Sequence, residues 1–147
     1  MPLIEIRALL APAAVLILWT LLVMAWMVIT RFSAFRTANI DLGKAKPGGR
    51  GQNLEGVLPD RVMWPSHNYA HLLEQPTLFY AVVVILALMG EASRINVALA
   101  WAYVGLRIIH SLWQIRVNLI PVRFLIFMLS SGVLIALAVR AVVAALA

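Results

Sequence analysis

The sequence contains no cysteine, and charged residues make up only 12% of its 147 positions. The lack of cysteine excludes disulfides, thiolate metal sites, iron–sulfur clusters and a cysteine nucleophile. Apolar and aromatic residues make up 63% of the chain, against about 45–50% in soluble domains. This composition argues against a soluble globular domain, and it excludes a disordered chain because so much apolar surface must be buried.

Four apolar stretches predict membrane-spanning helices at about 8–30, 66–90, 95–114 and 123–146, since a span needs about 20 apolar residues. The first stretch is too long for a signal peptide, and Arg31 and Arg36 follow it instead of a cleavage site. Short connections after the second and third stretches predict antiparallel neighbours. The expected fold is an all-α, four-helix transmembrane bundle in one domain, residues 1–147, with a long polar connection at 31–65.

The long connection is rich in glycine. Its stretch GKAKPGGRG, residues 43–51, lacks the Gly-Lys-Ser/Thr ending of a phosphate-binding loop, and no strand precedes it. We interpret it as a solvated, mobile connection.

Basic residues, which give the chain a net charge of +6, concentrate on one side of the predicted bundle. The connections after the first and third spans hold Arg31, Arg36, Lys44, Lys46, Arg50, Arg61, Arg116 and Arg123, whereas the opposite side holds Arg7, Arg94 and Arg140. This bias predicts that these connections are cytoplasmic and both termini outside. No exposed basic segment is interleaved with aromatic residues, so no nucleic-acid partner is expected.

Polar residues form a stripe on each of two predicted spans. The stripe on the second span holds Asn68, His71, Glu74, Gln75 and Leu78, and the one on the third holds Tyr103, Arg107, His110, Ser111, Gln114 and Asn118. At 1.5 Å per residue, Glu74 and His110 lie about 12 Å from the polar edge, and Arg107 about 16 Å. We therefore predict that the stripes face each other. Glu74 should pair with Arg107 or His110, because an unpaired buried charge is strongly unfavourable.

These polar residues have two interpretations. Intramembrane charges mark functional sites, whereas Gln75, Tyr103 and Ser111 suit hydrogen bonds between helices. Pro76 leaves the Leu72 carbonyl without its helical donor and predicts a kink. The arginines at the edge of the bundle either contact lipid head groups or hold an anionic ligand through forked guanidinium pairs. No metal site is predicted, since the three histidines lie at different depths.

The stretches NYAHLLEQPTLFYAVVVILAL (68–88) and LRIIHSLWQIRVNLIPVRFLIF (106–127) resemble the MAPEG family, the membrane-associated proteins of eicosanoid and glutathione metabolism. The most specific part is Arg107 with His110 and Ser111, followed by Pro121-x-Arg123. The resemblance implies a homotrimer that binds glutathione at the subunit boundary, open to the cytoplasmic side, while a lipophilic substrate arrives from the bilayer.

The resemblance also implies residue roles. Arg107 would contact glutathione, and Arg123 would be the catalytic residue that activates its thiol. The candidate residues for binding glutathione or another anion are Asn68, His71, Glu74, Arg107, His110, Gln114, Arg36 and Arg61. The chain departs from the family pattern at Trp64, where the family has arginine, and at His71, where it has glutamate. Gln114 replaces a frequent tyrosine. With these departures the chain looks like a bacterial branch of the family, which implies a bacterial inner membrane.

Two functions follow as hypotheses. The first is a glutathione-dependent transferase or peroxidase that acts on apolar electrophiles. The second is a non-catalytic protein of the same fold that binds a lipid or another amphiphile, or acts as an assembly partner. A small multidrug exporter is disfavoured, since the first span lacks the carboxylate that those proteins carry there.

Overall fold

Four long helices make up most of the chain in the computed structural model, which describes residues 3–44 and 47–147. They are α1 (Leu3–Thr37), α2 (Asp60–Leu88), α3 (Arg94–Arg116) and α4 (Ile120–Leu146), and two 3-10 turns lie at Leu42–Lys44 and Gly51–Leu54. The described residues contain no β-strand, only an isolated bridge between Glu55 and Leu58. The predicted all-α, four-helix fold is thereby confirmed.

The first two helices extend further than the apolar stretches that predicted them. Helix α1 continues to Thr37 and α2 begins at Asp60, so the connection is residues 38–59 rather than 31–65. Counting apolar residues detects only the part of a helix that fits in the bilayer. The helices themselves continue through polar residues, and α2 begins directly after Pro59.

The glycine-rich connection is tied to the ends of α1 and α2. Arg31 Nη2 donates to Ser66 Oγ at 2.5 Å, and the same guanidinium packs against Gly51. A Cβ at Gly51 would lie 2.8 Å from Arg31 Nη1, so a larger residue there would require the arginine side chain to shift. Ala45 and Lys46, part of the stretch that we interpret as mobile, lie outside the described residues.

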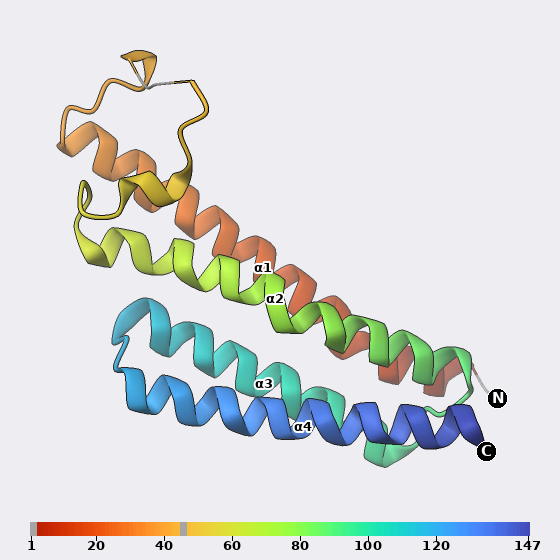
Figure 1. Cartoon of the computed structure of the whole chain (residues 1–147). Helices are drawn as coiled ribbons and strands as arrows, with labels where there is room; N and C mark the ends of the chain where they lie inside the picture. Colours follow the sequence, from red (N-terminus) through yellow and green to blue (C-terminus); the bar gives the residue numbers. More distant parts are fainter. Residues whose placement is uncertain (1–2, 45–46) are drawn as a thin grey trace.

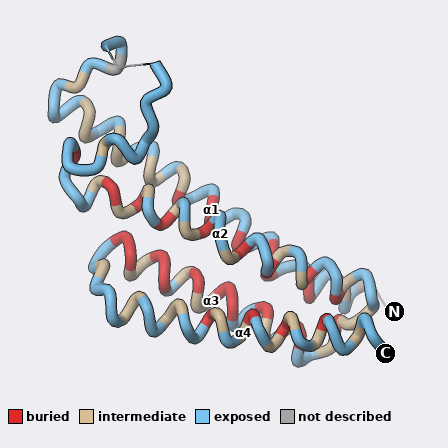
Figure 2. The backbone as a smooth tube through the Cα atoms, viewed as in Figure 1, coloured by how far each residue is buried: buried red, intermediate tan, exposed pale blue. Residues whose placement is uncertain are grey.

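The helices pack as two antiparallel pairs, α1 beside α2 and α3 beside α4 (Figure 1). Both ends of the chain lie at one end of the bundle, here called the terminal end, and the long connection lies at the other, here called the loop end. Buried residues follow the sides of the helices that face one another (Figure 2). The outside carries large apolar side chains, such as Leu88 at 83% exposure and Leu146 at 84%.

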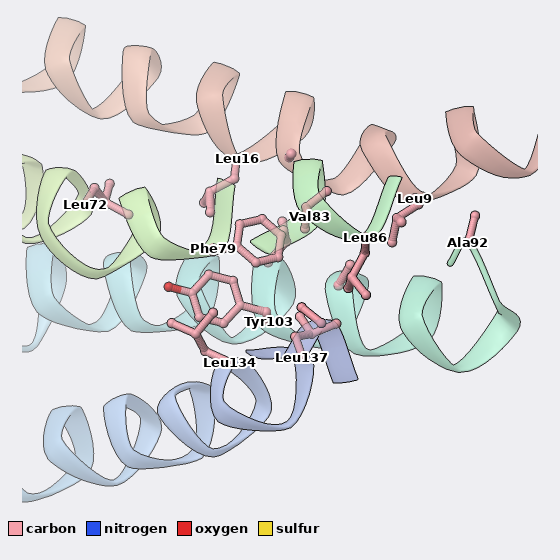
Figure 3. Packing of buried hydrophobic residues seen from close by; sticks show 14 of the residues in the cluster. Leu9, Leu16, Leu72, Phe79, Val83, Leu86, Ala92, Tyr103, Leu134 and Leu137 are labelled. Atoms are coloured by element: carbon pink, nitrogen blue, oxygen red, sulfur yellow. The ribbon is translucent and has the colours of Figure 1, made fainter. Parts of the chain in front are cut away.

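All four helices are long and apolar enough to cross a membrane. Together with the exposed apolar surface, this makes the chain an integral membrane protein. The core between the helices is closely packed: the rings of Phe79 on α2 and Tyr103 on α3 stack with centroids 4.4 Å apart, surrounded by Val83, Leu134 and Leu137 (Figure 3).

Polar contacts join α3 and α4 at both ends. At the terminal end, Arg140 on α4 donates through Nε to Asn96 Oδ1 and through Nη2 to Ser93 Oγ, the latter at 3.4 Å. Asn96 is fully buried and donates to the Glu91 carbonyl at 2.6 Å. At the loop end, Arg123 Nη1 donates to Asn118 Oδ1 at 2.7 Å. These contacts fix the register of α4 on α3.

We predict that Asn96→Leu destabilises the protein by about 2 kcal/mol, because it removes hydrogen bonds to a charged partner and to a main-chain carbonyl. Unfolding in detergent, followed by circular dichroism, measures the effect. Arg94→Ala, at an exposed position of the same turn, is the control. A loss for Asn96→Leu within about 0.5 kcal/mol, the range of neutral surface changes, would contradict the prediction.

Candidate functional site

The polar stripes of α2 and α3 face each other, as the sequence predicts. Asn68 Nδ2 donates to Gln114 Oε1 at 2.9 Å, and Arg107 Nη2 donates to the His71 carbonyl at 2.9 Å. The rings of His71 and His110 lie with their centroids 4.9 Å apart. Side chains far apart in the sequence thus form one polar layer inside the bundle.

Gln75 links three helices at the deeper edge of this layer. The Tyr103 hydroxyl donates to Gln75 Oε1 at 3.3 Å, and Gln75 Nε2 donates to Ser131 Oγ on α4 at 2.8 Å. Ser131 in turn donates to the Phe127 carbonyl at 2.8 Å. Gln75 and Tyr103 therefore make the interhelical hydrogen bonds that the sequence suggests.

The predicted pairing of Glu74 with Arg107 or His110 is wrong. The Glu74 carboxylate instead meets His71 on its own helix, with 3.2 Å between Oε2 and Nδ1, and its side chain is 70% exposed. Glu74 follows Asn68 by six residues, which rotates it about 120° round a helix of 3.6 residues per turn. Its side chain therefore leaves the face that packs on α3.

Arg107 is buried without an acidic partner. Arg107 is only 1% exposed. Its guanidinium donates a hydrogen bond to the main-chain carbonyl of His71, the residue just before Leu72. Nε and Nη1 of Arg107 have no hydrogen-bond partner among the described residues. The same holds for both ring nitrogens of His110, for Ser111 Oγ and for Asn68 Oδ1.

A cavity of about 200 Å³ lies beside this layer, between α2, α3 and α4. Its walls are His71, His110, Ile120, Arg123, Phe124 and Phe127. The Phe127 ring centroid lies 5.4 Å from that of His71. Two imidazoles and one guanidinium thus share the cavity with two phenyl rings.

The turn between α3 and α4 positions Arg123. Asn118 adopts a left-handed conformation, with φ of 56°, which asparagine tolerates better than most residues. Its main-chain N–H donates to the Trp113 carbonyl at 2.8 Å, so the turn closes the end of α3. Pro121 then suits the first turn of α4, and the Asn118 side chain holds the Arg123 guanidinium.

Of the predicted site residues, His71, His110 and Arg123 line the cavity, whereas Asn68, Glu74, Arg107 and Gln114 do not, and two more lie further away. Arg36 is exposed in the last turn of α1. Arg61 is exposed in the first turn of α2, where its guanidinium lies 5.8 Å from the Trp64 ring centroid. Neither lines the cavity. The described residues also hold no group of three or more metal-ligating side chains.

The sequence analysis missed the apolar walls of the cavity, which are Ile120, Phe124 and Phe127. Their spacing of four and three residues places them on one face of α4. Residues on every side of α4 are apolar, however, so this face has no contrast in the sequence that would mark it.

The charges of the site favour an anion. Within the described part of the chain, no carboxylate forms an ion pair with Arg107 or Arg123. Guanidinium groups bind carboxylates through paired hydrogen bonds, and the Arg123 guanidinium lines the cavity. The arrangement can therefore bind an anionic group next to an apolar one.

Comparison with known proteins supplies the family. The MAPEG family model matches residues 9–143, which include all of α2 and α3, most of α1 and α4, and every residue of the cavity. Neither the curated proteins nor the solved structures gave a match. The match runs through nearly the whole chain, well beyond the two stretches that carry the resemblance in the sequence. The chain belongs to the MAPEG family of membrane proteins.

Proposed function

We propose that this MAPEG member binds glutathione at the cavity between α2, α3 and α4 and acts as a transferase or peroxidase on lipophilic electrophiles. The observation that carries the proposal is the pair of guanidinium groups, Arg107 and Arg123, neither of which has a carboxylate partner in the described chain. Unpaired charges inside a membrane protein are strongly unfavourable. An anionic ligand would compensate them.

The residues present fit the chemistry of glutathione, which carries two carboxylates, one ammonium group and a thiol. Arg123 lines the cavity and can donate to a carboxylate, and Arg107, buried beside the cavity, adds a second positive charge. The cavity of about 200 Å³ is smaller than the roughly 300 Å³ at which ligand pockets begin. One chain therefore encloses only part of the tripeptide.

A second copy of the chain would complete the site. Ile120 and Phe124 line the cavity yet are 67% and 61% exposed, so the cavity opens at the side of the bundle. We propose that the chain forms the homotrimer that the family resemblance implies, with a neighbouring copy over this opening. In this arrangement the loop end, with its excess of arginine and lysine, is cytoplasmic.

Arg123 would activate the thiol. A free thiol has a pKa of about 8.5, and a neighbouring cation lowers it, so a guanidinium in the cavity favours the thiolate at neutral pH. The electrophile needs no polar site, because the bilayer concentrates apolar molecules against Phe124 and Ile120. The thiolate sulfur then bonds to the electrophilic carbon.

We predict that the purified protein binds glutathione, and that Arg123→Ala weakens binding at least about tenfold, since a hydrogen bond to a charged group contributes about 1.5–3 kcal/mol. Calorimetric titration measures the affinity, and turnover of chlorodinitrobenzene measures the activity. Arg116→Ala, at an exposed position of the same loop end, is the control. Absence of binding at millimolar glutathione would overturn the proposal.

A second candidate function is non-catalytic binding of an anionic amphiphile. Two observations favour it: Asn68 Nδ2 is engaged by Gln114, so this donor is not free for a ligand, and the Glu74 carboxylate faces away from Arg107. An amphiphile with one anionic group bound to Arg123 and an apolar chain along Phe124 and Ile120 would fill the cavity without a tripeptide.

Native mass spectrometry of the gently purified protein separates the two functions. If the chain binds an amphiphile, a lipid of fixed mass stays bound to the wild type and is lost from Arg123→Ala, while added glutathione does not displace it. If it binds glutathione, the tripeptide mass appears instead, and no lipid is retained in an Arg123-dependent way.

A further inference from the structure

We propose that His71 and Glu74 form a carboxylate–imidazole pair in which His71 accepts the proton of the bound thiol. This inference rests on the proposed function and assigns the proton acceptor at the same site. In this scheme His71 is a catalytic residue, and Glu74 is a positioning residue that acts through it.

The geometry of the pair sets the state of the imidazole. Glu74 Oε2 lies 3.2 Å from His71 Nδ1, so the carboxylate accepts a hydrogen bond from Nδ1–H. That bond selects the tautomer in which Nε2 carries no proton and is free to accept one. A carboxylate on the far nitrogen also stabilises the imidazolium that forms when the proton arrives.

The backbone and ring of His71 are held in place. Its carbonyl accepts the hydrogen bond from Arg107, and its ring packs against those of His110 and Phe127, at 4.9 and 5.4 Å between centroids. The ring lines the same cavity as Arg123. A thiol placed beside Arg123 therefore lies next to an oriented base.

The charged and titratable groups around His71 come from three helices. Glu74 lies on α2, Arg107 and His110 on α3, and Arg123 on α4. Glu74 alone among them is acidic. Removing its charge leaves His71 among cations, where an added proton is less stable.

The proton transfer balances without another reactant. The S–H bond of glutathione breaks, its electron pair stays on sulfur next to Arg123, and the proton bonds to His71 Nε2. When the thiolate attacks chlorodinitrobenzene, the C–S bond forms and chloride leaves with the C–Cl electron pair. His71 then passes its proton to water and is neutral again.

The chain offers a matched control pair. His67 Nε2 lies 3.1 Å from Glu55 Oε1, and both side chains are about half exposed, at 43% and 55%. This pair has the same two residue types at a similar distance, but neither residue lines the cavity. His67→Gln and Glu55→Gln therefore measure the effect of losing a His–Glu contact without changing the cavity.

The experiment compares H71Q, E74Q, H67Q and E55Q with the wild type in nanodiscs. Calorimetry gives the glutathione Kd, ultraviolet difference absorbance gives the thiolate fraction against pH, and stopped flow gives the rate with chlorodinitrobenzene. We expect H71Q to lower the rate at pH 7 about 10²–10⁴-fold, the usual contribution of a general base. E74Q should lower it at least about tenfold, and both should keep the Kd within about threefold of the wild type.

The pH profile separates a base from a structural role. The wild-type rate should fall at acid pH, where a protonated His71 cannot accept the thiol proton. In H71Q the rate should instead rise about tenfold per pH unit until the pH approaches the pKa of the bound thiol, which Arg123 holds below the free value of about 8.5. Because Glu74 is exposed, E74Q tests the idea even if H71Q does not fold.

Three results would overturn the inference. The first is that the wild type binds glutathione but H71Q or E74Q has an unchanged rate and pH profile. The His71–Glu74 pair is then not the proton acceptor, while the proposed function still stands. An equal loss in H67Q or E55Q assigns the effect to folding or surface charge. Failure of the wild type itself to bind glutathione removes both the inference and the proposed function.

Discussion

The hydrogen bond from Arg107 to the His71 carbonyl is the contact on which the polar layer depends. It places a guanidinium in the middle of an apolar bundle and joins it to a neutral main-chain group. The charge is therefore solvated but not neutralised. Because Arg123 is likewise held by a neutral amide, that of Asn118, the site keeps two positive charges available. A salt bridge at either position would have removed the demand for an external anion.

The fold could be predicted from the sequence because each span can be recognised from its own residues. A bilayer sets the length of a span, and a polar residue in an apolar helix stands out, so four helices and two facing stripes can be predicted. The error at Glu74 has a geometric cause: a short stripe accommodates a residue about 120° off its axis. The walls at Phe124 and Phe127 have no signal, because apolar residues lie on every side of α4 and do not mark one face as distinct.

In the α3–α4 hairpin, a short stretch of sequence positions Arg123, the proposed reactive arginine. Asn118 supplies both a left-handed backbone and a side-chain acceptor, so one residue ends α3 and holds Arg123. Arg140 fixes the opposite end through Asn96. With both ends fixed, α4 cannot slide along α3 without breaking a charged hydrogen bond, each of which contributes about 1.5–3 kcal/mol. Arg123 is therefore presented to the cavity by a stiff support rather than a mobile loop.

The departures from the family pattern form one consistent change. Where the family has glutamate, this chain has His71, and a carboxylate returns one turn later at Glu74, where it contacts that same histidine. Where the family often has tyrosine, Gln114 holds Asn68. In this chain Asn68 and Gln114, like His71 and Glu74, bind one another, and the imidazoles of His71 and His110 lie at the cavity. In the proposed function, Arg123 attracts the anion and the His71–Glu74 pair accepts the thiol proton.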